Sequence, residues 1–211
     1  MKVDFDIYLI TDRKQTCGKP LEEVINSSLA GGIKAVQLRE KDLDDRELFM
    51  LAKRLRTLTQ RSGATFIVND RLDLALAVDA DGLHLGQESI SPKDARKHFG
   101  ENKLIGVSAH SLDEAVRAED DGADFITIGP VYDTPSKRRY GKPIGLNELE
   151  RVTGKQKIPA FAIGGIRKDK IREVLAAGAH GISLISSILK SKDPEKAAKD
   201  MIEAIRYWKG K

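Results

Sequence analysis

The residues of this sequence best suited to chemistry are charged and polar groups that follow short apolar stretches. Four charged residues, beginning with Arg39, Glu40 and Lys41, follow the alternating stretch at 35–38. Cations that converge on a cleft need an anion, and one cation about 4 Å from one phosphate charge is worth roughly 4 kcal/mol at an effective dielectric constant of about 20. Arg39, Lys41 and the later Lys137 would together suit pyrophosphate, whereas any one of them alone could equally form a surface salt bridge.

A carboxylate and two histidines suggest further roles. Asp70 is a lone carboxylate among cations. It fits either a salt bridge or a ligand of Mg²⁺, which favours one or two carboxylates together with substrate phosphate oxygens. His110 follows Ser108 at the end of another stretch, where a neutral imidazole could act as an acid or a base. His84 alternates with leucines and is expected to be a structural group, and no cluster of His and Cys indicates zinc.

Glycines and hydroxyl groups near the end of the sequence suggest a phosphate site. Gly164–Gly165 follows one apolar stretch, and Ile185 and Ser186 follow the next. Glycines let a ligand approach the backbone, and N–H groups at helix starts bind anions. The alternative is a tight turn that needs glycine for its own conformation. Many barrels of unrelated function share this arrangement, so it predicts a phosphorylated ligand and little more.

Eight apolar stretches separated by helical patterns must position these residues. We predict strands at Ile7–Thr11, Ala35–Arg39, Thr65–Asn69, Gly82–Gly86, Leu104–Ser108, Phe125–Gly129, Pro159–Ile163 and Gly181–Ile185. Apolar residues at spacings of three and four predict helices at Leu21–Leu29, Asp113–Ala118, Lys170–Ala177 and Ala197–Trp208. Several of these helices end in Gly-containing turns, a common helix stop.

This alternation predicts a parallel sheet, and eight units in 211 residues predict one small (β/α)8 TIM barrel domain over residues 1–211. The alternative is an open doubly wound sheet, which would want a GxGxxG turn after the first strand. Thr11–Pro20 does not supply that turn. Because active sites of such barrels lie at the carboxyl ends of the strands, we expect the residues named above to converge there.

Composition narrows the class of protein. Aromatic residues are 5% of the sequence, and the net charge of +4 is spread along the chain, so we expect no nucleic-acid surface. The sequence contains no apolar run of about 18 residues, so we expect no membrane span. The N-terminus lacks the features of a signal peptide. Cys17 is the only cysteine, so no internal disulfide can form and a cytoplasmic location is expected.

Seven motifs, in order, resemble the thiamine phosphate synthase and thiazole tautomerase superfamily. They are QLREK (37–41), VNDR (68–71), ADGLHLGQ (80–87), GVSAHS (106–111), GADFITIGPVYDTPSK (122–137), AIGGI (162–166) and AGAHGISLIS (177–186). Each motif is weak alone, but together they cover nearly the whole chain and lie at expected strand ends.

The resemblance implies a role for each matching residue of the synthase. The residues implied to hold the pyrimidine pyrophosphate are Gln37, Arg39, Glu40, Lys41 and Asn69. Asp70 would bind Mg²⁺, and Ser108 and Lys137 would contact pyrophosphate. The residues implied to hold the thiazole phosphate are Thr134, Ser136, Gly165, Ile185 and Ser186. The family's habit also suggests a homodimer.

One departure from the synthase pattern keeps a second activity open. The synthase usually has a second Mg²⁺-binding Asp where this chain has Ser89, and the stretches SISPK (89–93) and AHSLDEA (109–115) look more like the tautomerase branch. There the counterpart of His110 transfers a proton. Tautomerases tend to lose the pyrophosphate residues, however, and this chain retains them. We therefore predict the synthase, with the tautomerase as the alternative and a non-catalytic metabolite-binding barrel as a third hypothesis.

Overall fold

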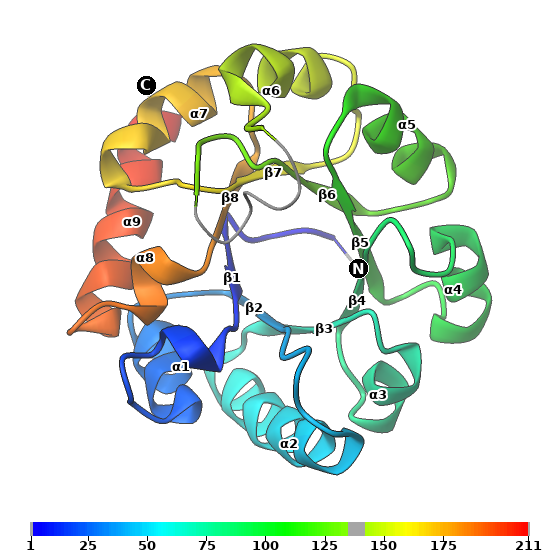
Figure 1. Ribbon diagram of the computed structural model, residues 1–211, viewed down its shortest axis with the longest axis vertical. Coiled ribbons are helices and arrows are strands. Elements are labelled where there is room, and N and C mark those ends of the chain that lie inside the picture. Colours follow the sequence, from blue (N-terminus) through cyan, green and yellow to red (C-terminus); the bar gives the residue numbers. More distant parts are fainter. Residues whose placement is uncertain (1, 135–141, 211) are drawn as a thin grey trace.

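The fold is a closed barrel of eight parallel strands, each of which pairs with the next and the last with the first (Figure 1). The computed structural model describes residues 2–134 and 142–210. The strands are β1 (Ile7–Ile10), β2 (Ala35–Leu38), β3 (Thr65–Asn69), β4 (Gly82–Leu85), β5 (Leu104–Ala109), β6 (Phe125–Ile128), β7 (Ala160–Ile163) and β8 (Gly181–Leu184). The predicted barrel is confirmed, and the open doubly wound sheet is excluded.

Helices surround the barrel in chain order (Figure 1). They are α1 (Leu21–Ala30), α2 (Asp45–Ser62), α3 (Leu72–Ala77), α4 (Pro92–Phe99), α5 (Leu112–Asp120), α6 (Gly145–Thr153), α7 (Ile171–Ala176), α8 (Ser186–Leu189) and α9 (Pro194–Lys209), with short 3-10 turns at Arg13–Gln15 and Lys168–Lys170. Side chains that accept a hydrogen bond from the first helical turn begin four of them: Asp44, Ser91, Ser111 and Asp193. Among the described residues, no helix is both long and apolar enough to cross a membrane.

The strands are short and buried because helices cover their outer face and side chains fill the inside. Four aromatic rings fill the amino end of the barrel interior. Phe5, which precedes β1, stacks on Phe161 with ring centroids 5.1 Å apart and meets Phe125 edge to face. Tyr8 also packs edge to face on Phe125, at 5.5 Å. The amino end is therefore closed by packing, and open space remains at the carboxyl end.

Candidate active site

Three adjoining cavities lie at the carboxyl ends of the strands. The Asp70 pocket, about 250 Å³, is lined by Arg39, Lys41, Asn69 and Asp70, among others. The central cavity, about 90 Å³, lies over the barrel axis and is lined by Gln37, Arg39, Asn69, His84, Ser108 and His110, among others. The Gly165 cavity, about 770 Å³, is lined by Thr134, Gly164, Gly165, Ile185 and Ser186, among others. The sequence-predicted residues within the described part of the chain therefore converge.

The cations of the Asp70 pocket differ in what they bind. Arg71 is held by two carboxylates, Asp45 at 2.6 Å and Asp73 at 2.7 Å. In contrast, neither Arg39 nor Lys41 forms an ion pair with any residue that the structure describes. The Arg39 backbone N–H donates to Thr11 Oγ1 at 2.9 Å, which fixes the start of the loop. Arg39 and Lys41 are thus the cations of this pocket that a ligand could use.

Asp70 is held by its backbone and by Ser89. Its φ of 67° is unusual for a residue other than glycine, and its N–H donates to the His84 carbonyl oxygen at 2.8 Å. Ser89 Oγ donates to Asp70 Oδ1 at 2.5 Å and accepts from the Gly86 N–H at 2.8 Å. Ser89, which replaces the second Mg²⁺-binding Asp of the synthase pattern, therefore contacts the predicted metal ligand directly.

The donor set around Asp70 suits Mg²⁺ more than a metal held by protein alone. Within the described residues, no group of three or more His, Cys, Asp or Glu side chains could hold a metal ion. Mg²⁺ is commonly held by one or two carboxylates, with substrate phosphates and waters completing the shell. Asp70 in a pocket that is also lined by Arg39 and Lys41 fits that pattern.

Glu40 supports a loop. Strand alternation sends Gln37 and Arg39 toward the barrel interior and Glu40 to the opposite side. Both Glu40 carboxylate oxygens accept from the Arg13 N–H, at 3.0 and 3.2 Å, and the side chain is buried. Burial raises the pKa of this carboxyl, partly offset by hydrogen bonds from Thr11 and Arg13. Glu40 therefore anchors the β1–α1 loop, a contact that the sequence analysis did not anticipate.

A chain of polar side chains crosses the barrel beneath the central cavity. Gln37 Nε2 donates to the Tyr8 hydroxyl at 2.8 Å, which lies 3.4 Å from His84 Nδ1. His84 Nε2 lies 3.0 Å from Ser108 Oγ, and the Thr127 hydroxyl donates to the same oxygen at 3.4 Å. Burial raises the pKa of Tyr8 well above its usual value, so this phenol stays protonated. His84 is a structural interior group, as expected, and it supports Ser108.

His110 lies at the edge of the central cavity with one ring nitrogen engaged. Its Nδ1 is 3.0 Å from Glu114 Oε2, which also accepts the His110 backbone N–H at 2.8 Å. The His110 side chain is 39% exposed, so the ring reaches solvent as well as the cavity. A carboxylate on Nδ1 fixes the ring and leaves Nε2 for another partner.

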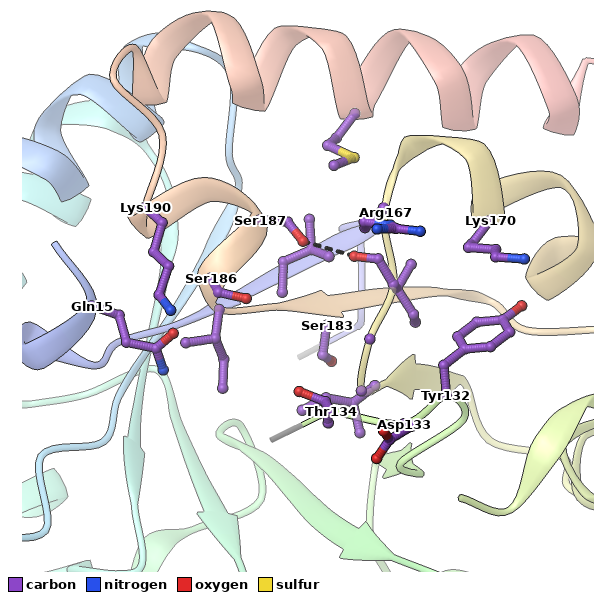
Figure 2. Close-up of a pocket in the computed structure, with 17 residues that line it drawn as sticks. Gln15, Tyr132, Asp133, Thr134, Arg167, Lys170, Ser183, Ser186, Ser187 and Lys190 are labelled. Carbon is purple, nitrogen blue, oxygen red and sulfur yellow. Dashed lines mark hydrogen bonds between the residues drawn. The ribbon is translucent and has the colours of Figure 1, made fainter. Parts of the chain in front are cut away.

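The Gly165 cavity is shaped by two glycines that no other residue could replace without strain. Gly164 and Gly165 have φ values of 98° and 68°. An added Cβ would lie 2.5 Å from a Pro130 carbon or 2.8 Å from a Tyr132 carbon. Across the cavity, α8 begins at Ser186, and the Ser187 hydroxyl donates to the Ile166 carbonyl oxygen at 2.7 Å (Figure 2).

Sequence reasoning missed several residues of these cavities. Ser136 and Lys137 lie outside the described residues, so their predicted roles stay predictions. Tyr8 joins the polar chain from within β1. It was missed because only residues at strand ends were expected to form the site. The other missed residues line the Gly165 cavity: Gln15, Tyr132, Arg167, Lys170, Ser183 and Lys190. Arg167 and Lys190 could have been found, because each follows a predicted strand within a few residues.

Comparisons with known proteins agree with this geometry. The model of a family described as thiamine monophosphate synthase matches residues 7–188. The thiamine-phosphate synthase of Moorella thermoacetica is 47% identical, covering 98% of this chain and 99% of the relative, and that of Clostridium novyi is 42% identical, covering 95% and 98%. A solved thiamine phosphate pyrophosphorylase from Pyrococcus furiosus is 40% identical with a TM-score of 0.88, covering 97% of this chain and 96% of that one. The chain therefore belongs to the thiamine monophosphate synthase family.

Proposed function

We propose that this protein joins hydroxymethylpyrimidine pyrophosphate to thiazole phosphate, giving thiamine phosphate and pyrophosphate. The continuity of the three cavities is the observation that carries the proposal. Arg39 and Asn69 line both the Asp70 pocket and the central cavity, and Gly164 and Ile185 line both the central and the Gly165 cavities. Two anionic substrates held at the outer cavities would bring their uncharged rings together in the middle.

The chemistry needs charge stabilisation more than a protein nucleophile. Breaking the C–O bond leaves a pyrimidinyl-methyl cation and a pyrophosphate that gains negative charge. The thiazole nitrogen then forms the new C–N bond. Arg39 and Lys41 would stabilise the leaving group from the Asp70 pocket, and Ser108 would donate a hydrogen bond to it. Lys137 is proposed to add a third cation, as the family resemblance implies.

Asp70 is the residue of this chain that would hold Mg²⁺. When bound, the ion supplies positive charge that stabilises the departing pyrophosphate. The hydrogen bond from Ser89 to Oδ1 of Asp70 would orient the carboxylate that holds the ion. Because this chain has Ser89 where the synthase usually has a second Mg²⁺-binding Asp, the binding of the ion should depend more on the phosphates of the substrate.

A direct assay tests this proposal. The purified protein would be incubated with both substrates and Mg²⁺, and the products separated by chromatography. We expect thiamine phosphate and pyrophosphate in equal amounts, with both lost when Mg²⁺ is chelated. Absence of thiamine phosphate at any Mg²⁺ concentration would refute the assignment.

A second candidate activity, tautomerisation of carboxythiazole phosphate, is supported by the pairing of His110 with Glu114. A positioned base contributes about 10² to 10⁴-fold to such a proton transfer. His110→Gln should nearly abolish tautomerisation, whereas it should reduce the synthase reaction only modestly. If the wild type tautomerises in a His110-dependent way and makes no thiamine phosphate, the tautomerase is the correct function. If His110→Gln loses synthase activity as completely as Lys137→Ala does, His110 belongs to the synthase chemistry.

We also infer a reducing cytoplasm and a homodimer as the setting of this enzyme. The free thiol of Cys17 is exposed, which suits a compartment that keeps thiols reduced. Light scattering on the eluting protein measures its mass in solution. A mass of one chain at working concentrations would contradict the dimer.

A further inference from the structure

Lys190 occupies a fixed place at the rim of the Gly165 cavity. It follows the last residue of α8, and its N–H donates to the Ser186 carbonyl oxygen at 3.1 Å. The Cys17 thiol donates to the Lys190 carbonyl oxygen at 3.7 Å, which ties this backbone to the β1–α1 loop. In Figure 2 the Lys190 side chain extends toward the side chains of Ser186 and Gln15. The ammonium group therefore borders the same space as the Ser186 hydroxyl.

The cations that line this cavity are not equivalent. Arg167 lies 3.6 Å from Asp169, and Lys170 lies 3.0 Å from Glu173 and stands over the Tyr132 ring. Within the described part of the chain, Lys190 has no carboxylate partner. A positive charge that faces a cavity without a counter-charge is positioned to attract an anion.

A buried hydroxyl in the same cavity also lacks a partner. The Ser183 side chain, in β8, belongs to a residue that is 2% exposed, and its Oγ forms no hydrogen bond with any described residue. A buried polar group normally finds a partner, so the empty hydrogen-bonding capacity points to a ligand or water at this wall. The cavity thus has an unmatched hydroxyl in its buried wall and an unmatched cation at its rim.

We propose that Lys190 recognises the phosphate monoester of the second substrate and selects it over the corresponding alcohol. Ser183 contacts the part of the ligand that both forms share. The proposal rests on the proposed function for the identity of the substrate, but the site itself is defined by a phosphate monoester of any source. Because Lys190 is exposed, solvent screens its charge, and we expect an effect of about tenfold.

Substitution of Lys190 with two substrate forms tests the selection. For Lys190→Gln we expect kcat/KM for thiazole phosphate to fall about tenfold through KM, with kcat/KM for the unphosphorylated thiazole alcohol unchanged. Lys190→Arg should restore most of the preference. Lys192→Gln, which removes a charge two residues away and outside the cavity lining, is the matched control and should change neither value.

Ser183→Ala separates phosphate recognition from general ligand binding. It should lower kcat/KM for both thiazole forms by a similar factor, so that the ratio between them stays at the wild-type value. Equal losses for both forms in Lys190→Gln, or a fall in kcat in place of a rise in KM, would overturn the proposal. So would the same loss of selection in Lys192→Gln, because that result would indicate a diffuse charge effect.

Direct binding of inorganic phosphate distinguishes failure of this proposal from failure of the proposed function. Phosphate would be titrated into labelled protein while the backbone amide signals of Gly165 and Ser186 are followed by NMR. We expect these signals to shift on titration and the apparent Kd to weaken about tenfold in Lys190→Gln. If the wild type makes no thiamine phosphate yet shows this difference, the synthase assignment fails and the role of Lys190 stands. An unchanged Kd would overturn the role of Lys190.

Discussion

The two ends of the barrel differ in how their charged groups are paired. At the amino end, two aspartates each bind an arginine and a backbone N–H. Asp81 lies just before β4. Its Oδ2 accepts hydrogen bonds from the Arg56 guanidinium at 2.7 Å and from the Phe66 N–H of β3 at 2.8 Å. At the carboxyl end, by contrast, Arg39, Lys41 and Lys190 have no carboxylate partner within the described residues.

The amino-end arrangement is repeated two strands later. Asp124 lies just before β6. Its Oδ2 accepts hydrogen bonds from the Arg96 guanidinium at 2.6 Å and from the Ile105 N–H of β5 at 2.6 Å. Each aspartate thus joins a strand to the helix that precedes it. The comparison indicates that these two ion pairs join strands to helices at the amino end, whereas three cations at the carboxyl end have no carboxylate partner among the described residues and could meet a ligand. Substitutions at the two ends should therefore separate stability from activity.

The largest effect is expected from Asp70→Asn at the carboxyl end. Loss of the predicted metal ligand should reduce Mg²⁺-dependent pyrophosphate release by more than about 100-fold, because bound metal ions contribute several kcal/mol. The midpoint of thermal unfolding should stay within a few degrees of wild type. A variant with full Mg²⁺-dependent turnover would remove Asp70 from the metal site.

Asp124→Ala at the amino end should show the opposite pattern. It leaves the Ile105 N–H and the Arg96 guanidinium without their shared acceptor, so we expect a loss of roughly 1–3 kcal/mol in the free energy of unfolding. Denaturant titration measures this loss, and turnover per folded molecule should not change. If instead activity falls while stability is retained, the division between the two ends fails.

A smaller effect is expected from Ser89→Asp, which adds a carboxylate beside Asp70. The Mg²⁺ concentration needed for half-maximal activity should fall about threefold to tenfold, equivalent to about 0.7–1.4 kcal/mol. Ser89→Asn is the matched control, since it has a similar size and no charge. Identical Mg²⁺ titrations for both variants and wild type would indicate that residue 89 does not face the metal.

The smallest effect concerns the pH dependence of stability at the amino end. Burial lowers the pKa of His180, and the charge of Lys209 lowers it further, against smaller raising effects of Asp6 and the Phe5 backbone. The unfolded chain therefore binds a proton near pH 6.5 while the folded chain does not. Stability falls as the pH drops below about 6.5, by less than about 1.4 kcal/mol per pH unit. His180→Gln should flatten this slope in denaturant titrations at pH 7 and pH 5.5, and an unchanged slope would assign the acid sensitivity to other groups.

Much of the fold could be predicted from local patterns, and the predicted strands end within a residue or two of the observed ones. The differences have local causes: β5 reaches Ala109 because that residue still pairs with Ile128 of β6. The expectation that site residues lie at the carboxyl ends of the strands also holds for Asn69, Ser108 and Gly165, which line adjoining cavities.

Side-chain partners could not be predicted, because they come from segments distant in the sequence. Glu40 stands in the same charged run as Arg39, yet it binds the backbone of Arg13, 27 positions earlier. Arg71 follows Asp70 and is neutralised by Asp45 and Asp73, a pairing that depends on where α2 begins. The sequence shows the sign of each charge. It does not show whether that charge already has a partner in the folded chain.

The polar chain beneath the central cavity also fixes the direction in which protons point. Gln37 donates to the Tyr8 hydroxyl, so Tyr8 directs its own proton to Nδ1 of His84. A neutral imidazole that accepts at Nδ1 carries its proton on Nε2, from which it can donate to Ser108 Oγ, which also accepts from Thr127. The Ser108 proton is left to point into the cavity, where it can meet an anion. Turning over the buried amide of Gln37 would reverse the imidazole tautomer and leave Ser108 Oγ without the imidazole proton, so an uncharged residue of β2 determines which way the Ser108 proton of β5 points.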